Sequence, residues 1–138
     1  MPHFTTKLTV RTYECDQYGH VNNATFLNYL EYARVELLRE MGYSLNSFQK
    51  MGLLLLVVKI EIGYKRPAYP LEELELSIEW TKRGKSSSVF HQQIRRTGDN
   101  QVVADAQVTW VVTDLKGVPT PIPDEMTETY RRKFNADI

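Results

Sequence analysis

Four stretches of alternating apolar and polar residues follow one long apolar helix, and this order constrains the fold of the chain more than any other feature. The stretches are residues 53–64, 71–81, 86–96 and 102–113. Period-two alternation is typical of strands with one covered face, and the turns between the last three are short enough for antiparallel hairpins. With a further alternating stretch at residues 6–13, the chain predicts an α+β fold in which a mostly antiparallel sheet curls around the helix.

The predicted helix covers residues 24–41 and is apolar on more than one side. Its main apolar face repeats at spacings of three and four and comprises Phe26, Leu30, Ala33, Leu37 and Met41. Asn22 or Asn23 supplies an N-cap oxygen, and Gly42 stands where a left-handed residue commonly ends a helix. We therefore expect a core helix here, and a short second helix at residues 127–134.

The length and charge of the chain narrow its class. A length of 138 residues favours one domain spanning residues 1–138. Basic and acidic residues number 17 each, so no overall positive charge is available to attract nucleic acid. The most apolar stretch, residues 53–58, is far shorter than the roughly 20 residues of a membrane-spanning helix, and it predicts a buried strand. Cys15 is the only cysteine and no secretory pattern opens the chain, so a cytoplasmic location is expected.

A polar loop at residues 14–22 concentrates the side chains that can do chemistry. Asp16, Gly19 and Val21 form the pattern D-x-x-G-x-V directly before the predicted helix. This pattern resembles the 4-hydroxybenzoyl-CoA thioesterase family of hotdog-fold proteins. The run His-Val-Asn-Asn that follows is similar to bacterial long-chain acyl-CoA thioesterases, and the likeness extends to residues 64–68, 84–86 and 102–106.

The resemblance implies a hotdog fold, which is a curved antiparallel five-stranded sheet wrapped around a long central helix. It also implies hydrolysis of medium- to long-chain fatty acyl-CoA to free acid and CoA. Asp16 is expected either to attack the thioester or to activate a water, and the sequence leaves both routes open. The backbone N–H of Asn23, seven residues later, is expected to stabilise the oxyanion at the helix start. His20 is expected to orient Asp16, hold a water or help the thiolate leave.

The resemblance places substrate-binding residues in three segments: Tyr18, Val21, Arg66, Lys85 and Ser86. Coenzyme A carries several phosphate charges, so a chain with no net charge must gather basic groups locally. Two segments do this, Lys65 with Arg66 and the predicted hairpin at residues 82–86. The acyl chain is expected along the helix, against Phe26 and Leu30.

Hydrolysis requires no cofactor, and coenzyme A is itself part of the substrate. The three histidines show no ligand spacing, so no metal site is expected. An open sheet face carrying Trp80 or Trp110, together with the family resemblance, implies a homodimer or homotetramer.

Several alternatives remain open. A hotdog domain can bind acyl-CoA without hydrolysing it, since fold alone does not decide function. An acyl-carrier-protein thioesterase is a second alternative, although Tyr18 stands where that family's motif has asparagine; a hotdog dehydratase fits the motif less well. Glu31 and Glu36 are reserve catalytic carboxylates, and Glu31 can also pair with Arg34. Cys15 is expected to be structural, because strand alternation points it away from its neighbour Asp16.

Overall fold

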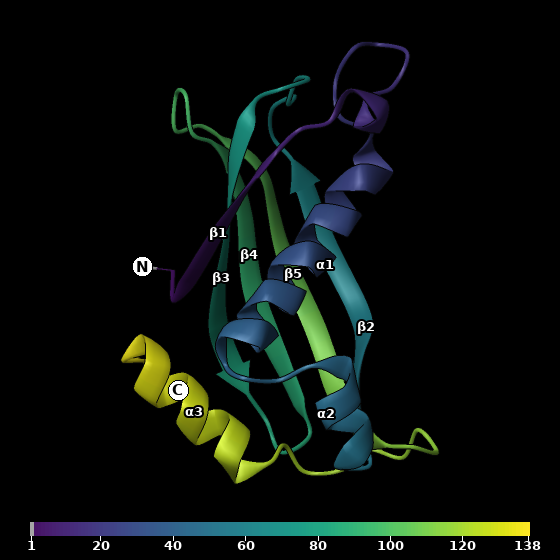
Figure 1. Ribbon diagram of the computed structural model, residues 1–138, viewed down its shortest axis with the longest axis vertical. Coiled ribbons are helices and arrows are strands. Elements are labelled where there is room, and N and C mark those ends of the chain that lie inside the picture. The colour runs from purple at the N-terminus through teal and green to yellow at the C-terminus, as the bar shows by residue number, and fades with distance from the viewer. Residues whose placement is uncertain (1) are drawn as a thin grey trace.

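Five antiparallel strands form one sheet in the order β1-β3-β4-β5-β2, and a long helix lies along it (Figure 1). The computed structural model describes residues 2–138. In chain order the elements are β1 (Phe4–Thr9), a 3₁₀ turn (Thr12–Glu14), α1 (Asn23–Glu40), α2 (Leu45–Lys50), β2 (Leu53–Tyr64), β3 (Glu73–Arg83), β4 (Ser87–Arg96), β5 (Val102–Asp114) and α3 (Asp124–Phe134). The architecture expected from the sequence is confirmed.

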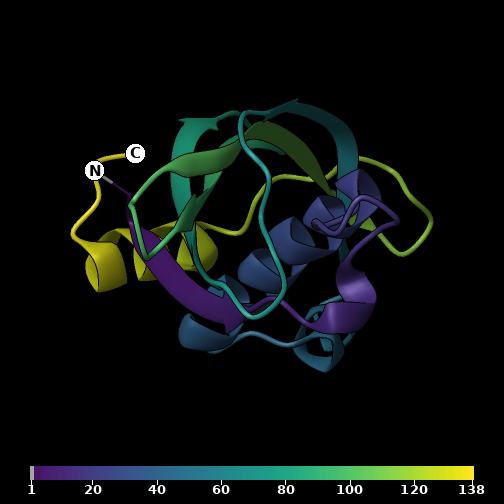
Figure 2. The same cartoon turned by 90° about the horizontal axis from the view of Figure 1, so that it is seen from above.

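The sheet arches over α1, and the core lies between them (Figure 2). All five residues of the predicted helical face are buried, and so are the apolar residues of β3 and β5 that face α1. Gln92 is the polar exception on β4. It is fully buried, donates to the Leu30 carbonyl oxygen at 3.1 Å and accepts from Arg34 Nη1 at 3.0 Å, which ties the middle of α1 to the sheet.

The ends of α1 follow from local chemistry. The Asn22 side chain caps the helix by accepting from the Ala24 N–H at 2.9 Å. Gly42 has a φ of +90°, the left-handed conformation that glycine adopts without a steric cost. Among residues 2–138, no helix has the length and apolar character needed to cross a membrane.

The boundaries of two elements differ from the sequence prediction. The first strand ends at Thr9 instead of continuing to residue 13, because the chain turns into a 3₁₀ helix at Thr12. The C-terminal helix α3 begins at Asp124, three residues earlier than expected, and α2 was not predicted at all.

The predicted open face with Trp80 or Trp110 is wrong. Both indoles are buried, at 1% and 3% exposure, on the side of the sheet that the helices cover. The amphipathic helix α3 packs Tyr130 against Trp80, with ring centroids 5.0 Å apart. The opposite face of the sheet is polar instead, with His91 bonded to Asp105 at its centre.

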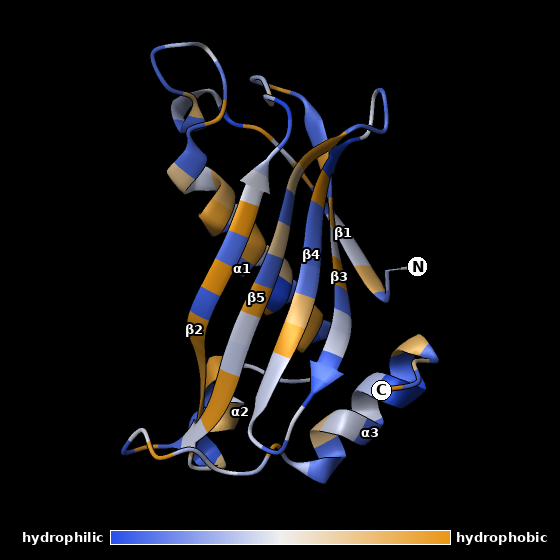
Figure 3. Cartoon of the chain, turned by 180° about the vertical axis from the view of Figure 1, so that it is seen from behind, coloured by the Kyte–Doolittle hydropathy of each residue, from blue (hydrophilic) through white to orange (hydrophobic). Residues whose placement is uncertain are grey.

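The prediction that residues 53–58 form a buried strand is also wrong for the single chain. The strand forms, but Leu56, Val57 and Val58 are 41%, 41% and 60% exposed. The reason is topological: β2 pairs only with β5, so it is an edge strand with one unpaired side (Figure 3). A bulge between Val57 and Lys59 disturbs its alternation.

Candidate active site

The loop that carries Asp16 is a small hairpin held at the start of α1. Two backbone hydrogen bonds and one β-bridge hold its two sides together. The Asn22 N–H donates to the Glu14 carbonyl oxygen at 3.1 Å, and the Asp16 N–H donates to the His20 carbonyl oxygen at 2.9 Å. Between these bonds, Cys15 and Val21 form the antiparallel bridge. The hairpin has a tight turn because Gly19 takes a φ of +82° and donates to the Asp16 carbonyl oxygen. Asp16 therefore sits in a defined position beside the helix start.

The two oxygens of the Asp16 carboxylate have different surroundings. Oδ1 accepts from the Tyr18 N–H at 2.8 Å, which fixes the side chain. Oδ2 lies 3.9 Å from His20 Nδ1, too far for a hydrogen bond, and accepts from no donor elsewhere in residues 2–138. The side chain is about one-quarter exposed, at 24%. Oδ2 is therefore the oxygen available to attack a carbonyl carbon or to take a proton from water.

The first turn of α1 leaves one backbone donor free. The Asn22 side-chain oxygen accepts a hydrogen bond from the Ala24 N–H, and the Asn22 backbone carbonyl oxygen accepts one from the Thr25 N–H, at 2.9 Å. The Asn23 N–H, which precedes both, meets no acceptor in the described chain. A free N–H at the positive end of an 18-residue helix suits an oxyanion.

A hydrogen bond between Tyr29 and Glu14 fastens the hairpin to the helix. The buried Tyr29 hydroxyl donates to Glu14 Oε1 at 3.0 Å, and the same carboxylate accepts from the Arg11 N–H at 2.8 Å. Burial raises the pKa of Tyr29, and the bond to Glu14 raises it further, so the hydroxyl keeps its proton. Sequence reasoning missed this pair, because a tyrosine 15 residues from a glutamate carries no local signal.

Cys15 is not arranged as a nucleophile. Its side chain packs against the core, and burial together with the carboxylates of Asp16 and Glu14 raises its pKa. The thiol form is inert compared with the thiolate. This agrees with the structural role expected for it.

His20 and Tyr18 lie next to each other on the hairpin. Their rings stack with centroids 6.2 Å apart, and His20 also meets the Tyr69 ring edge-on at 6.4 Å. Tyr18 is 74% exposed, so in the single chain it walls nothing. Val21 is 1% exposed and packs in the core, and its N–H donates to the Ala68 carbonyl at 2.8 Å. Its predicted contact with substrate stays a prediction.

The expected acyl position against Phe26 and Leu30 is wrong, because both are core residues at 2% and 1% exposure. An apolar cavity of about 670 Å³ lies instead between the second half of α1, α2 and the first half of β2. Its walls include Val35, Leu38 and Phe48.

The expected pairing of Glu31 with Arg34 is also wrong. Arg34 Nη1 turns inward to Gln92, and Glu31 stays exposed at the rim of the cavity. Burial lowers the pKa of Arg34, while the Glu31 charge opposes that shift without an ion pair.

The residues predicted to bind CoA fall at opposite ends of the sheet. The Arg66 N–H donates to Val103 near the start of β5, whereas the Ser86 carbonyl oxygen accepts from Val112 near its end. Nine residues of strand separate these contacts, which is about 30 Å. One chain therefore does not bring Arg66 together with Lys85 and Ser86.

Comparison with known proteins places this fold and loop among thioesterases. Residues 10–129 match the Thioesterase-like superfamily. The long-chain acyl-CoA thioesterase FadM of Escherichia coli K12 is 39% identical over 114 residues, which cover 80% of this chain and 83% of FadM. The crystal structure of YbaW, a probable thioesterase from Escherichia coli, has a TM-score of 0.81 and 32% identity, covering 94% of this chain and 98% of that one.

A thioesterase from Thermus thermophilus, complexed with coenzyme A and Zn, has a TM-score of 0.85 at 24% identity, covering 99% of this chain and 98% of that one. At this identity the likeness concerns the fold. The curved antiparallel sheet around one long helix, together with these matches, makes this chain a hotdog protein of the thioesterase type. The chain belongs to the Thioesterase-like superfamily, and the predicted resemblance is confirmed.

Proposed function

We propose that this protein hydrolyses acyl-CoA thioesters to a free acid and CoA. The observation that carries the proposal is that two groups without partners occur at the same end of α1. They are the carboxylate oxygen Asp16 Oδ2 and the backbone N–H of Asn23. The identity to FadM over most of both chains supports an acyl-CoA substrate. A medium- to long-chain acyl group is our inference from the apolar cavity.

Two routes use these groups equally well. Asp16 Oδ2 can attack the thioester carbon and form an anhydride that water then hydrolyses, or it can take a proton from the attacking water. In both routes the carbonyl oxygen gains negative charge, which the Asn23 N–H stabilises, and the sulfur leaves as CoA thiolate. His20, beside Asp16, supplies a proton to that thiolate or holds the water.

The test is thiol release from acyl-CoAs of increasing chain length and from a benzoyl ester, with Asp16→Asn as the variant. We expect turnover by the wild type and a loss of at least about 100-fold in Asp16→Asn, the usual contribution of a general base. Asp137→Asn, near the C-terminus, is the control for a lost carboxylate and keeps its activity. Acyl-CoA binding without turnover of any ester would support the alternative of a non-catalytic binding module. Hydrolysis of an acyl group from acyl carrier protein, but not from CoA, would support the alternative of an acyl-carrier-protein thioesterase.

We infer further that the active unit is an oligomer, at least a dimer, built on the β2 edge. An exposed apolar edge strand readily pairs with another chain. Two-fold pairing of β2 with a second β2 would be antiparallel, so the Asp16 end of one copy would lie beside the other copy's cavity. Each site would then combine a hairpin from one chain with an acyl cavity from the other.

The assembly is tested by sedimentation of Val58→Glu against Val118→Glu. Both valines are more than half exposed, at 60% and 56%, but only Val58 lies on the β2 edge. We expect Val58→Glu to reduce the mass and the turnover together, and Val118→Glu to change neither. A wild-type monomer with full activity would contradict the shared site.

Two further expectations belong with this proposal. A cytoplasmic location rests on the single cysteine, which suits a reducing compartment. Cofactor-free hydrolysis stays a prediction; across residues 2–138, no three His, Cys, Asp or Glu side chains gather as metal ligands do.

A further inference from the structure

One guanidinium group lines the apolar cavity between α1, α2 and β2 without forming an ion pair. The charged residues around this cavity are Glu31, Arg34 and Arg39. Arg39 is 68% exposed and pairs with Glu36 at 2.8 Å. Arg34 is partly buried, and within residues 2–138 its side chain bonds only to a neutral acceptor. The exposed Glu31 carboxylate influences the Arg34 charge from the rim but makes no direct contact with it.

The single hydrogen bond of the Arg34 side chain leaves most of its donors free. Nη1 donates to Gln92 Oε1 at 3.0 Å. A guanidinium carries five N–H donors, and in the described chain neither Nε nor Nη2 of Arg34 meets an acceptor. Both nitrogens keep accessible surface, because the fully buried side-chain polar atoms without a partner are others: Tyr43 Oη, Ser88 Oγ and Trp110 Nε1. Since Arg34 lines the cavity, its free donors are open to a ligand there.

The bond to Gln92 does not by itself require a cation. Gln92 is fully buried, and its amide is oriented because it donates to the Leu30 carbonyl oxygen at 3.1 Å. A neutral donor at Arg34 could make the same bond without the cost of taking a charge out of water. Arg34 does carry this cost, since burial lowers the pKa of its guanidinium. A partly buried cation without an ion pair, at the wall of a cavity, indicates a binding site for an anion.

The remaining walls of the cavity suit an alkyl chain. They include Val35 and Leu38 on α1, Phe48 on α2, and β2 from Leu53 to Val57. The β2 wall covers four residue steps, or roughly 13 Å of strand. With a volume of about 670 Å³, the cavity has room for a medium-length alkyl chain beside Arg34. A ligand with one anionic head and one apolar tail therefore matches both the charge and the walls.

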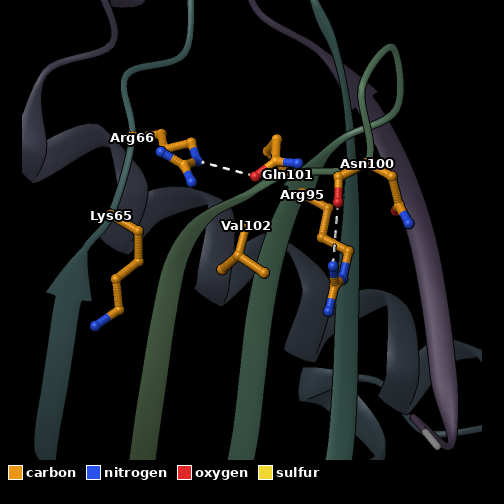
Figure 4. Close-up of a pocket in the computed structure, with 6 residues that line it drawn as sticks. All are labelled: Lys65, Arg66, Arg95, Asn100, Gln101 and Val102. Atoms are coloured by element: carbon orange, nitrogen blue, oxygen red, sulfur yellow. Dashed lines mark hydrogen bonds between the residues drawn. The ribbon is translucent and has the colours of Figure 1, made fainter.

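A second cavity, at the opposite end of β2, lacks this combination. It is lined by Lys65, Arg66, Arg95, Asn100, Gln101 and Val102 (Figure 4). Arg66 Nε donates to Gln101 Oε1 at 3.1 Å, and Arg95 Nη1 donates to the Asn100 carbonyl oxygen at 3.2 Å. Val102 is the one aliphatic residue in this lining. Of the two cavities, only the one at Arg34 joins a guanidinium to apolar walls.

We propose that the cavity at Arg34 binds a free fatty acid, with the carboxylate on Arg34 and the alkyl chain against α1, α2 and β2. A planar guanidinium binds a carboxylate through two parallel N–H···O bonds. Nε and Nη2 form one such pair of donors, and they are the two nitrogens that the described chain leaves free. The inference rests on the proposed function in one respect, because a free fatty acid is the product of that hydrolysis. Product held in this cavity competes with the next acyl chain.

Calorimetry with decanoate, decanol and decanedioate tests the site without turnover. We expect Arg34→Gln to weaken decanoate binding at least about tenfold, the usual effect of losing hydrogen bonds between charged groups. The introduced amide can still donate to Gln92, so the fold is retained, which thermal unfolding checks. Decanol has the same tail without the charge and should bind both proteins alike. Arg39→Gln changes another cation of the same lining and is the matched control, with decanoate binding unchanged.

Each other outcome decides against the inference or for it. Decanoate binding that Arg34→Gln leaves unchanged would overturn it, and so would equal losses for decanoate and decanol, which indicate a damaged cavity. Tighter binding of decanedioate than of decanoate would overturn it in favour of the distal carboxylate of a dicarboxylic acyl group. If Arg34→Gln does not fold, Arg34→Lys carries the same comparison, since it keeps the charge but not the paired donors.

The failure of this inference can be told apart from the failure of the proposed function. Decanoate binding that depends on Arg34, in a protein that releases no thiol from any thioester, would support the fatty-acid site and contradict the hydrolysis. If hydrolysis does occur, decanoate should inhibit the wild type in competition with acyl-CoA, and it should inhibit Arg34→Gln at least about tenfold more weakly. Equal inhibition of the two proteins would refute the site while leaving the hydrolysis intact.

Discussion

Replacing Asn23 with proline removes the proposed oxyanion donor and nothing else of consequence. Asn23 is the first residue of α1, the position where proline is favoured because its N–H has no helical partner. The preceding residue, Asn22, has ψ of 139°, in the extended range compatible with a following proline. Its side-chain cap on Ala24 is retained. The fold should therefore accept Asn23→Pro with little change in the free energy of unfolding.

The activity of Asn23→Pro, in contrast, should fall sharply. Loss of one oxyanion donor costs roughly 100- to 1,000-fold in kcat, or about 2.7–4 kcal/mol. Asn23→Ala, which loses the side chain but keeps the N–H, is the matched control and should stay within a few-fold of wild type. The assay is thiol release at saturating acyl-CoA, with urea unfolding of each variant. If a folded Asn23→Pro protein turned over as fast as Asn23→Ala, the helix start would not be the oxyanion site.

Two other predictions concern the groups that hold the fold. Tyr29→Phe should lower the free energy of unfolding by about 1.5–3 kcal/mol, because it removes a hydrogen bond to the carboxylate of Glu14. Tyr32 is 39% exposed on the same helix, so Tyr32→Phe should leave the free energy of unfolding almost unchanged. Equal losses in the two variants, measured by urea unfolding, would contradict this prediction. Burial lowers the pKa of His3 below 6.5 and Glu79 only partly offsets this, so the folded protein binds that proton less readily than the unfolded chain. The contribution of His3 to stability should then be complete above pH 6.5 and be lost as the pH falls through the pKa of the folded state. Melting temperatures measured from pH 7.5 to pH 5 should decline more for the wild type than for His3→Gln. Identical declines in the two proteins would refute this prediction.

Regular alternation made most of the fold predictable. Strand β2 was expected at residues 53–64 and occupies Leu53–Tyr64. The element missed, α2, has six residues, too few to display a helical period, although its capping pair Ser44 and Ser47 was visible in the sequence. Burial was harder to predict than secondary structure, because it depends on strand order: Val58 is apolar but lies on an edge.

The site divides in the same way. Asp16 and Asn23 were predicted from a local motif, because one short segment carries both. Their roles in catalysis stay predictions. The position of Arg95 beside Arg66 was not predicted, because only the pairing of β4 with β5 brings Arg95 to that end of the sheet. Contacts between distant segments leave no periodic signal in one sequence, so the cavity that these two residues line could be found only from the structure.

The length of α1 supports the proposal that two chains contribute to each site. Asn23 opens the helix, and the cavity wall begins at Glu31, eight residues or about 12 Å further along. Between these points the apolar face of the helix is already filled by the core, since Phe26 and Leu30 are at most 2% exposed. An acyl group attached at Asp16 therefore has no buried route to the cavity of its own chain. In the proposed dimer the unpaired β2 edge would provide the missing element, because antiparallel pairing there would bring a second cavity to the hairpin. The proposed chemistry and the proposed assembly thus depend on the same strand.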